Sequence, residues 1–521
     1  MAQQPEDKRP DRKPLDRDPV PPPRDRISAV QGRVLDPATA LVVKGVTPRP
    51  TVYVGPRLTI SKSVDVGGAI QVLSYVAERL GWSVTLEPED PRTARLKYGL
   101  RKVSIDVASD RAAIAPDGWT LLQQTRAQFG VESVRGVGLD HVVFTADLES
   151  DPFHASNPFH ASNPFHASNP AGAEMSAPVA TYAAQGSGGR QPIAYVGPDP
   201  VRRTEVVGRR PVVAVLDTGC AKHPWLDRAV TKGIALDGVS IGYDEPVSDP
   251  ELHGDLLGQL DGMIDPLSGH GTFIAGLIHQ ACPDADILCW RVVPSAGPIV
   301  ESDLVATLAQ IAELARRGQA GEPGGRVIDV LSLSMGYYHE TPEDELFDPT
   351  LYTILEELAQ NGTLVVCSAG NDATSRPSFP AAFAPWSNHL GPYPAVPDCL
   401  PVVSVGALNP NSRTDALFTN TGPWVSAYVP GAALMSTMPR FQGGLQPVAR
   451  TRAFGRVRES IDPDDYRGGF GLWSGTSFAA PLLAGRIAAE LGPGLEETVD
   501  AATRIARMWS VVENVTDLSP H

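Results

Sequence analysis

Three polar side chains of this 521-residue chain are of the types that together perform nucleophilic catalysis. Asp217 follows the apolar run Val212–Leu216, His270 stands between two glycines, and Ser477 precedes an apolar segment. A serine hydroxyl attacks a carbonyl when an imidazole takes its proton and a carboxylate orients that imidazole. Each residue by itself also fits a turn or a helix cap. Together, Asp, His and Ser follow one of the known chain orders of a catalytic triad.

The elements that must position these residues alternate along the chain. Unbroken apolar segments, typical of buried parallel strands, alternate with helical patterns. The expected strands are 212–216, 287–293, 327–333 and 363–367, and the expected helices between them are 302–317 and 351–360. We therefore predict an α/β fold, a parallel sheet covered by helices on both faces, with the chemistry at the carboxyl ends of the strands.

Two further helices are expected to begin at the candidate catalytic residues. His270 opens the helical pattern Thr272–Ala281. Ser477 precedes Phe478–Leu491, in which Pro481 fits the first turn, where a missing N–H costs least. A hydroxyl at a helix N-terminus is favoured by the helix dipole and lies beside N–H groups that can bind an oxyanion.

Three motifs give the chain a family resemblance. Asp-Thr-Gly begins at Asp217, Gly-His-Gly-Thr-x-x-Ala-Gly surrounds His270, and Gly-Thr-Ser-x-Ala-Ala-Pro surrounds Ser477, at spacings of 53 and 207 residues between the three candidates. In this order they resemble the subtilisin-like serine peptidases (subtilases), over about residues 210–495. The resemblance implies a subtilisin-like catalytic domain and a serine endopeptidase in which Ser477 is the nucleophile, His270 the general base and Asp217 its partner.

The resemblance also implies an oxyanion residue and a substrate cleft. Asn371 would donate its side-chain amide to the oxyanion. The residues that would bind substrate are Ser334, Met335 and Gly336 on one wall and Ser368, Ala369 and Gly370 on the other. Two positions depart from the family pattern, Phe273 and Leu482, where histidine is common. Neither is a triad member, so we expect a change in packing around the cleft and no loss of catalysis.

Charge and composition exclude several classes of protein. The chain carries 60 acidic and 44 basic residues, a formal charge of −16, which argues against a nucleic-acid binder. No apolar run is long enough for a membrane span, and the N-terminus lacks a signal-peptide pattern. Five cysteines, an odd number, do not form a disulfide framework. These features favour a cytoplasmic protein, although export without a leader would leave the same sequence.

The chain divides into four predicted segments. Residues 1–50 are charged and proline-rich and are expected to be disordered. Residues 51–148 show the order βαββαβ of a small α+β, ferredoxin-like domain. Residues 149–209, which contain three FHASNP repeats, are expected to be a flexible linker, although the repeat histidines could in principle bind a metal. Residues 210–521 form the catalytic domain.

The small domain has a candidate role because many subtilases carry an α/β propeptide that assists folding and then inhibits. The expected partners are therefore a peptide or protein substrate and this intramolecular propeptide-like domain, with self-cleavage between Leu148 and Arg210. Two alternatives stay open. The same acyl-enzyme could transfer its acyl group to an amine (a peptide ligase or macrocyclase), or the chain could be a non-catalytic peptide-binding scaffold.

The resemblance implies no required cofactor and leaves calcium binding open. Carboxylates available for calcium are Asp261, Asp265, Asp284 and Asp286, without a recognisable loop motif. Two apparent insertions, 339–349 and 439–473, are expected to shape the rim of the cleft. The first carries Glu340, Glu343, Asp344, Glu345 and Asp348, so it would favour basic substrates if it faces the cleft, and is otherwise a solvated loop.

Overall fold

The computed structural model describes residues 16–109, 113–145, 182, 185–257, 262–295, 297–341, 350–444, 447–497 and 499–520. The FHASNP repeats therefore lie outside the described residues, as do the four acidic residues 343, 344, 345 and 348. No helix of the described residues is both long enough and apolar enough to cross a bilayer.

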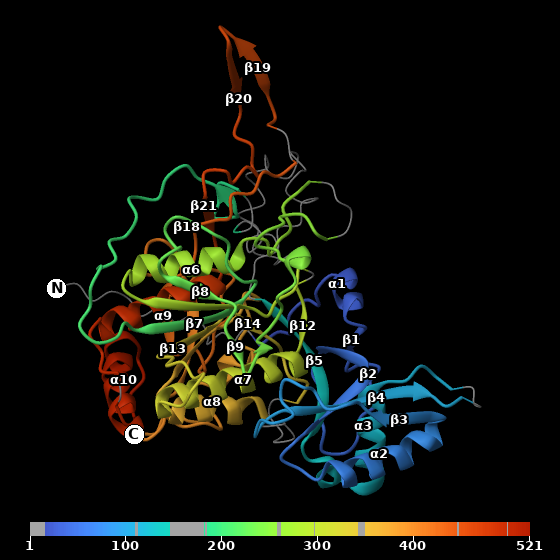
Figure 1. Cartoon of the computed structure of the whole chain (residues 1–521). Helices are drawn as coiled ribbons and strands as arrows, with labels where there is room; N and C mark the ends of the chain where they lie inside the picture. Colours follow the sequence, from blue (N-terminus) through green and yellow to red (C-terminus); the bar gives the residue numbers. More distant parts are fainter. Residues whose placement is uncertain are drawn as a thin grey trace, which may run out of the picture.

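A seven-stranded parallel sheet organises the C-terminal part of the chain, as the apolar segments predict (Figure 1). Its spatial order is β17-β16-β15-β13-β7-β11-β8. The strands are β7 (Val212–Asp217), β8 (Val230–Lys232), β11 (Asp286–Arg291), β13 (Val330–Leu333), β15 (Leu364–Ser368), β16 (Val402–Leu408) and β17 (Ala427–Pro430). Because all seven run in the same direction, their carboxyl ends share one edge of the sheet.

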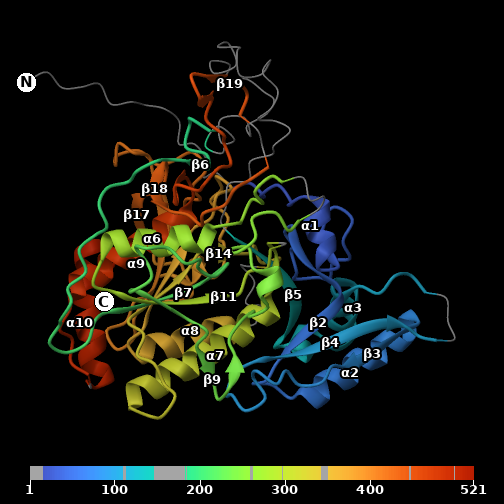
Figure 2. The ribbon, with the colours of Figure 1, turned by 45° about the horizontal axis from the view of Figure 1, so that its top comes forward.

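Helices cover both faces of this sheet. One face packs against α6 (His270–Ala281), α9 (Thr476–Leu491) and α10 (Ala501–Val515). The other packs against α7 (Glu301–Ala320) and α8 (Thr350–Gln360). Figure 2 shows α6 and α9 on the side opposite α7 and α8. The two hydrophobic cores are therefore separated by the sheet.

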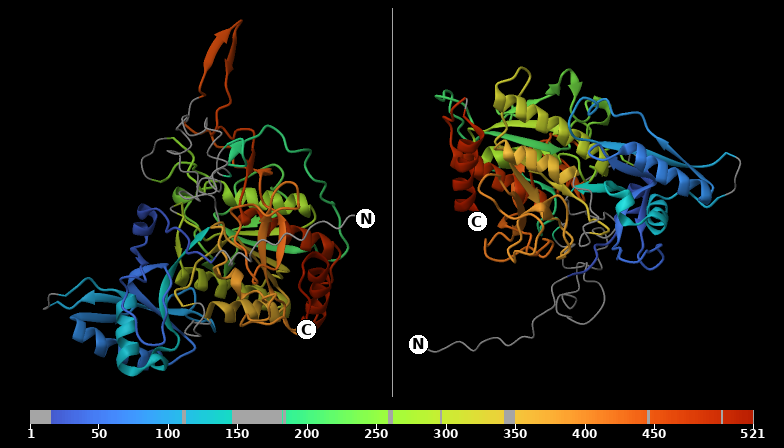
Figure 3. Two further views of the ribbon diagram at one scale, coloured as in Figure 1. Left: turned by 180° about the vertical axis from the view of Figure 1, so that it is seen from behind. Right: turned by 90° about the horizontal axis from the view of Figure 1, so that it is seen from below.

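A smaller domain lies beside this body (Figure 3). Its elements follow the order βαββαβ: β2 (Thr51–Ser61), α2 (Val66–Leu80), β3 (Trp82–Leu86), β4 (Leu100–Val107), α3 (Gly118–Phe129) and β5 (Val137–Thr145). All its strand pairs are antiparallel, in the order β5-β2-β4-β3. This is the order of elements that the sequence predicts for residues 51–148.

The prediction of disorder over residues 1–50 is wrong for residues 16–50. This segment forms α1 (Arg24–Ala29) and β1 (Gly32–Leu35), and β1 pairs with β2. Ahead of them, the Asp18 carboxylate accepts a hydrogen bond from the buried Arg376 at 3.1 Å. The charged composition suggested solvated side chains, but here a charged side chain has a partner inside the fold.

The predicted flexible linker is likewise ordered over residues 185–209. Its β6 (Gln191–Pro192) pairs with β21 (Phe470–Trp473). The Arg190 guanidinium donates to the carbonyls of Ile264, Asp265, Pro266 and Ser268. Arg190 thereby ties this segment to the loop that precedes α6.

The remaining elements are short. They are β9 (Ala235–Leu236), β10 (Val239–Ser240), β12 (Ile299–Val300), β14 (Met335–Gly336), β18 (Leu434–Thr437), β19 (Arg450–Ala453), β20 (Arg456–Glu459) and the 3₁₀ helices η1 (Val131–Val134), η4 (Pro246–Ser248) and η5 (Ala381–Phe383). β19 and β20 form a hairpin that projects away from the body (Figure 1). The insertion 439–473 thus contributes a projecting hairpin as well as β21.

Candidate active site

Asp217 and His270 meet at the carboxyl edge of the sheet. Asp217 is the last residue of β7, and His270 is the first residue of α6. His270 Nδ1 and Asp217 Oδ1 lie 2.6 Å apart, and both side chains are fully buried. Asp217 Oδ1 also accepts from the backbone N–H of Thr218 at 2.8 Å. The carboxylate is therefore fixed in the position that orients an imidazole.

Ser477 lies in the first turn of α9, as predicted. Its hydroxyl is buried and forms no hydrogen bond with the residues that the structure describes. Its neighbour Phe478 packs on the His270 ring with 5.0 Å between ring centroids, which brings the start of α9 against the imidazole. N–H groups of a first helical turn can bind an anion. In α9 those of Thr476 and Phe478 already donate to Asn371 and Gly475, so the N–H of Ser477 is placed for this role.

Asn371 is held by its carbonyl oxygen. Oδ1 accepts from both the backbone N–H and the hydroxyl of Thr476, each at 2.9 Å. Thr476 also accepts from the N–H of Gly370 at 3.1 Å. With Oδ1 fixed against the residue before Ser477, the orientation of the Asn371 amide group is set relative to the nucleophile.

The predicted substrate-binding residues lie on neighbouring strands. β13 and β15 pair in parallel, with Leu333 opposite Cys367, so the segments after them, 334–336 and 368–370, leave the sheet side by side. The Ser334 hydroxyl donates to the carbonyl of Ser477 at 2.8 Å. Met335 and Ala369 are buried, and Gly370 has φ +104°, a backbone region that favours glycine. The structure thus brings both predicted walls next to Ser477.

An aromatic cluster surrounds the imidazole and explains one departure from the family pattern. Phe273 packs on Phe478 at 4.6 Å and on Trp473 at 5.8 Å between ring centroids. The rings of Trp473 and His270 pack edge to face, with 5.6 Å between their centroids. The side chain at 273 therefore belongs to the packing around the site, as expected. Trp473, from the insertion before Ser477, is a site residue that motif matching did not identify.

A buried carboxyl group, Glu251, was also missed. It is 2% exposed and contacts Thr218 and Thr272, the threonines of the motifs that contain Asp217 and His270. Burial raises the pKa of Glu251 to about 7. Its sequence surroundings contain no motif, so only the fold could reveal it.

Glu340 does not belong to a solvated acidic loop. It is buried, and its Oε2 lies 2.6 Å from His141 Nε2 in the small domain. Its backbone carbonyl accepts from the N–H of Arg49 at 2.8 Å. Glu340 therefore does not fit the hypothesis that the acidic segment 339–349 favours basic substrates, because it is paired with His141 at the boundary between the two domains, and the other four acidic residues of that segment lie outside the described residues.

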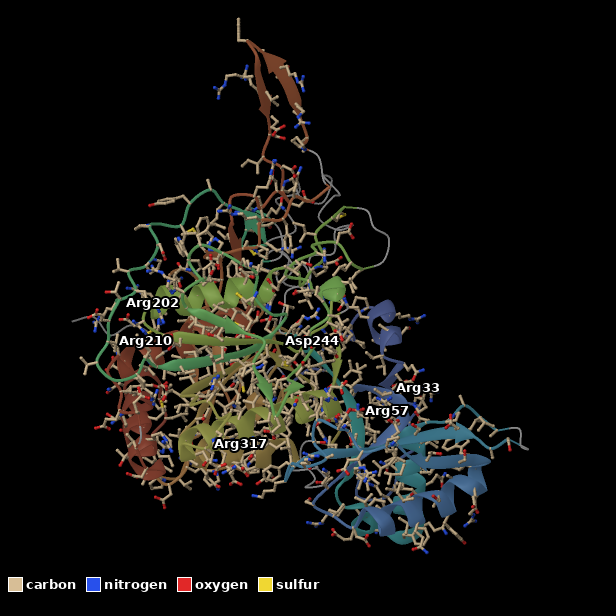
Figure 4. All side chains as sticks on the ribbon, viewed as in Figure 1. Arg33, Arg57, Arg202, Arg210, Asp244 and Arg317 are labelled. Carbon is tan, nitrogen blue, oxygen red and sulfur yellow. The ribbon has the colours of Figure 1, made fainter. Side chains whose placement is uncertain are left out.

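Three of the four carboxylates considered for calcium have other partners in the structure. Asp284 pairs with Arg210 at 2.9 Å, and Asp286 pairs with Arg202. Both arginines lie on the side of the catalytic domain away from the small domain (Figure 4). Asp265 accepts from two backbone N–H groups, and Asp261 lies outside the described residues. Arginine-paired carboxylates do not fit a calcium site.

Comparison with known proteins adds independent information. Residues 208–496 match the model described as the subtilase family. An "Intracellular serine protease" of Paenibacillus polymyxa is 27% identical over 292 residues, 54% of this chain and 66% of that protein, just under two thirds of its length. The "Major intracellular serine protease" of Bacillus subtilis is 24% identical over 298 residues, covering 54% of this chain and 69% of that protein. The solved structure of fervidolysin from Fervidobacterium pennivorans is 16% identical, with a TM-score of 0.45, over 87% of this chain and 56% of that one.

Proposed function

Because the chain belongs to the subtilase family of serine-type endopeptidases, we propose that it hydrolyses peptide bonds through Ser477, His270 and Asp217. Ser477 Oγ attacks the scissile carbonyl while His270 takes its proton and then delivers it to the leaving amine. Asp217 holds the imidazole tautomer and stabilises its charged form. Water then releases the acyl group from Ser477 by the reverse sequence of proton transfers.

The observation that carries this proposal is the 2.6 Å contact between His270 Nδ1 and Asp217 Oδ1, with Ser477 at the start of the adjoining helix. Asn371 and the N–H of Ser477 supply the oxyanion site in this mechanism. An extended substrate pairs with the segment 334–336 as an added strand. Segments 334–336 and 368–370 form the walls of the pocket for the residue before the scissile bond.

The test compares wild type with Ser477→Ala. Wild type should degrade casein and react with a fluorophosphonate probe, and the labelled peptide should contain Ser477. Ser477→Ala should do neither while retaining the thermal unfolding of wild type. A folded wild type that neither cleaves nor reacts would contradict the proposal. If an amine is added to the reaction and the acyl fragment of the substrate is recovered joined to that amine, the product mass would instead show acyl transfer.

We further propose that the small domain is an intramolecular inhibitor. β5 pairs antiparallel with β14, with Thr145 opposite Met335 and Phe144 opposite Gly336. It also pairs with β12, with Val143 opposite Ile299. β5 therefore takes the hydrogen-bonding positions of the wall that substrate needs, and it competes directly with substrate.

Buried polar contacts support tight docking of this domain. His141 of β5 lies between Glu301 and Glu340, with 2.6 Å from each ring nitrogen to a carboxylate oxygen. Asp140 accepts from the N–H and the hydroxyl of Ser302, each at 2.9 Å, at the start of α7. The charge of His141 is thus paired across the domain boundary, while Asp140, which Arg57 of the small domain also contacts at 3.3 Å, gains two further hydrogen bonds there.

The same cluster resembles a metal site in composition, since His141, His339 and Glu340 are all buried within reach of one another. Two ligands of one tetrahedral zinc ion lie about 3.3 Å apart, given bond lengths of about 2 Å. The 2.6 Å between His141 Nε2 and Glu340 Oε2 instead fits a shared proton. We therefore assign the cluster to an ion pair.

Self-processing follows if the small domain is a removable inhibitor. We expect wild type to shorten on incubation by a cut between Leu148 and Arg210, and Ser477→Ala to stay full length, as judged by intact mass. Activity should rise as the small domain is lost. An intact wild-type chain with full activity would contradict this part and leave the peptidase proposal standing.

We also propose a cytoplasmic location. All five cysteines are free thiols in the structure, and the two similar proteins named above are called intracellular. Free buried thiols suit a reducing compartment. Cell fractionation with an antibody to the chain would test this, and recovery from the medium of intact cells would contradict it.

A further inference from the structure

Glu251 lies directly behind the Asp217–His270 pair. Its Oε1 accepts from the hydroxyl of Thr218 at 2.5 Å and from the backbone N–H of Gly271 at 3.0 Å. Its Oε2 accepts from the hydroxyl of Thr272 at 2.5 Å. A nearly inaccessible carboxyl group with three such contacts stabilises a defined arrangement of its donors.

These three donors share one property: each immediately follows a triad residue or lies in the same helical turn. Thr218 follows Asp217 at the end of β7, while Gly271 and Thr272 follow His270 at the start of α6. The Thr218 oxygen also accepts from the N–H of Gly271 at 2.8 Å. One carboxyl group thus joins the strand that carries the aspartate to the helix that carries the histidine.

The Thr218 hydroxyl connects Glu251 to the triad. A threonine hydroxyl has one proton to donate. Thr218 Oγ1 lies 2.5 Å from Glu251 Oε1 and 3.1 Å from Asp217 Oδ1. The Thr218 hydroxyl therefore donates its hydrogen bond to an ionised Glu251 in preference to Asp217. A protonated Glu251 can donate to Thr218, which frees the threonine proton for Asp217. The proton on Glu251 therefore decides how many hydrogen bonds the catalytic carboxylate receives.

The surroundings let both protonation states form. Burial raises the pKa of Glu251 to about 7, the hydrogen bonds from Thr218 and Thr272 oppose this rise, and the neighbouring carboxylates add to it. The ionisable groups that face it from the packed elements are Asp217, Asp249, Cys289 and Arg291.

We propose that Glu251 is a positioning residue of the catalytic site, which fixes Asp217 against His270 and adjusts, through Thr218, the hydrogen bonding of the catalytic carboxylate. This inference rests on the proposed peptidase function. Glu251 touches neither the substrate nor the reacting atoms, so its effect passes entirely through the triad.

The test uses the full chain with Glu251→Gln, Glu251→Ala and a charge-matched control, Glu245→Gln. The Glu245 side chain is 61% exposed and lies 3.4 Å from Arg291, so the control removes the same charge from a nearby position while the backbone carbonyl of Glu245 still accepts from Arg291. Active sites are counted with a fluorophosphonate, and kcat and KM are measured per active site on a chromogenic peptide from pH 5 to 9. Thermal unfolding is recorded for each protein.

Glu251→Ala should lower kcat by about 10- to 100-fold with little change in KM, because misplacing a catalytic pair slows chemistry more than binding. Glu251→Gln should keep the size and shape of the side chain and remove its negative charge. Its acidic limb of kcat/KM should therefore move to lower pH, since a negative charge beside Asp217 and His270 favours imidazolium. Glu245→Gln should retain the wild-type profile.

If Glu251→Gln has the same kcat and the same pH profile as Glu245→Gln, the inference is overturned and the proposed peptidase function is unaffected. If Glu251→Ala fails to fold and gives no active-site titre, the isosteric Glu251→Gln decides. A reduced melting temperature with unchanged kcat per active site would show a purely structural role and would also overturn it. A folded wild type without cleavage or labelling would instead remove the proposed function and this inference with it.

Discussion

The amide of Asn371 illustrates how the active site is built at the scale of single residues. Its oxygen accepts two hydrogen bonds from Thr476, so the amide group is fixed by the residue that precedes the proposed nucleophile, Ser477. A fixed donor stabilises developing negative charge without reorganising in the reaction. This arrangement makes the expected contribution of Asn371 specific to the transition state.

We expect Asn371→Ala to lower kcat by about 10²–10³-fold with little change in KM, a magnitude known for the oxyanion asparagine of subtilisin itself. Thr476→Val is the control: it removes the hydroxyl's hydrogen bond to Asn371 and the one that the hydroxyl accepts from the N–H of Gly370, and it retains the backbone N–H that holds Asn371. It should cost far less. Steady-state kinetics on a peptide substrate measures both, and equal losses in the two variants would contradict the assignment of Asn371 to the oxyanion.

Contacts between elements depend on close backbone approach where β7 meets α6. A Cβ on Gly271 would lie 2.0 Å from the carbonyl oxygen of Gly219, in the turn after Asp217. Backbone cannot move aside as a flexible side chain can. This glycine therefore permits the helix and the strand end to approach closely enough for the Asp217–His270 contact.

We predict that Gly271→Ala greatly reduces the folded yield and abolishes fluorophosphonate labelling of what remains. Gly67→Ala in α2 is the control, since its Cβ would meet only the Asp65 side chain at 3.4 Å and alanine favours helix. That variant should equal or exceed wild type in melting temperature. A stable Gly271→Ala protein that still reacts with the fluorophosphonate would show that β7 and α6 can move apart without loss of the active site.

The segment before α1 provides a second prediction at this scale. Arg376 is fully buried and bonds Asp18 and the carbonyl of His339. Asp18→Asn should lower the free energy of unfolding by about 1–2 kcal/mol, because it removes the negative charge that pairs with the buried guanidinium of Arg376. The effect is limited because Asp18 is partly exposed and solvent screens the pair. Asp16→Asn, whose carboxylate contacts only the side chain of Arg49 among the described residues, should cost less. Calorimetry in the Ser477→Ala background measures both, and equal melting temperatures would contradict an anchoring role.

At the scale of the whole molecule, the interface between the two domains contains buried ionisable groups, so its stability depends on pH. Burial would lower the pKa of His141, but Glu340 and Glu301 outweigh it and raise the pKa to about 10. Burial lowers the pKa of the neighbouring His339 to about 4. His141 is therefore charged and His339 neutral around pH 7.

The sign of the effect follows from linkage. A histidine with a raised pKa contributes stability that is complete below its unfolded pKa near 6.5 and is lost as pH rises through about 10. In the Ser477→Ala background, the melting-temperature advantage of His141 over His141→Gln should thus shrink steadily from pH 7 to 10. His253→Gln, at an exposed position, should show no such trend. A constant advantage across this range would contradict the charged pairing of His141.

Several features followed from the sequence alone. The apolar strand segments, the helices that begin at His270 and Ser477, and the three motifs around the triad were predicted, and the structure places the corresponding elements there. Local patterns suffice here because strand burial, helix starts and glycine-dependent turns depend on residues close in the chain. The acidic composition likewise led us to expect no nucleic-acid partner.

Only the tertiary structure decided which distant residues meet. Glu251 behind the triad, Glu340 against His141 and Asp18 against Arg376 lack a local motif, and two of these carboxylates were expected in solvated or disordered segments. The environment of a charged side chain is set by segments far away in the chain, which bury it and supply its partner. The sequence therefore indicated the proposed catalytic groups and the elements that bear them, while long-range packing determined how those groups are held and what covers them, because burial and pairing of charge depend on the whole fold.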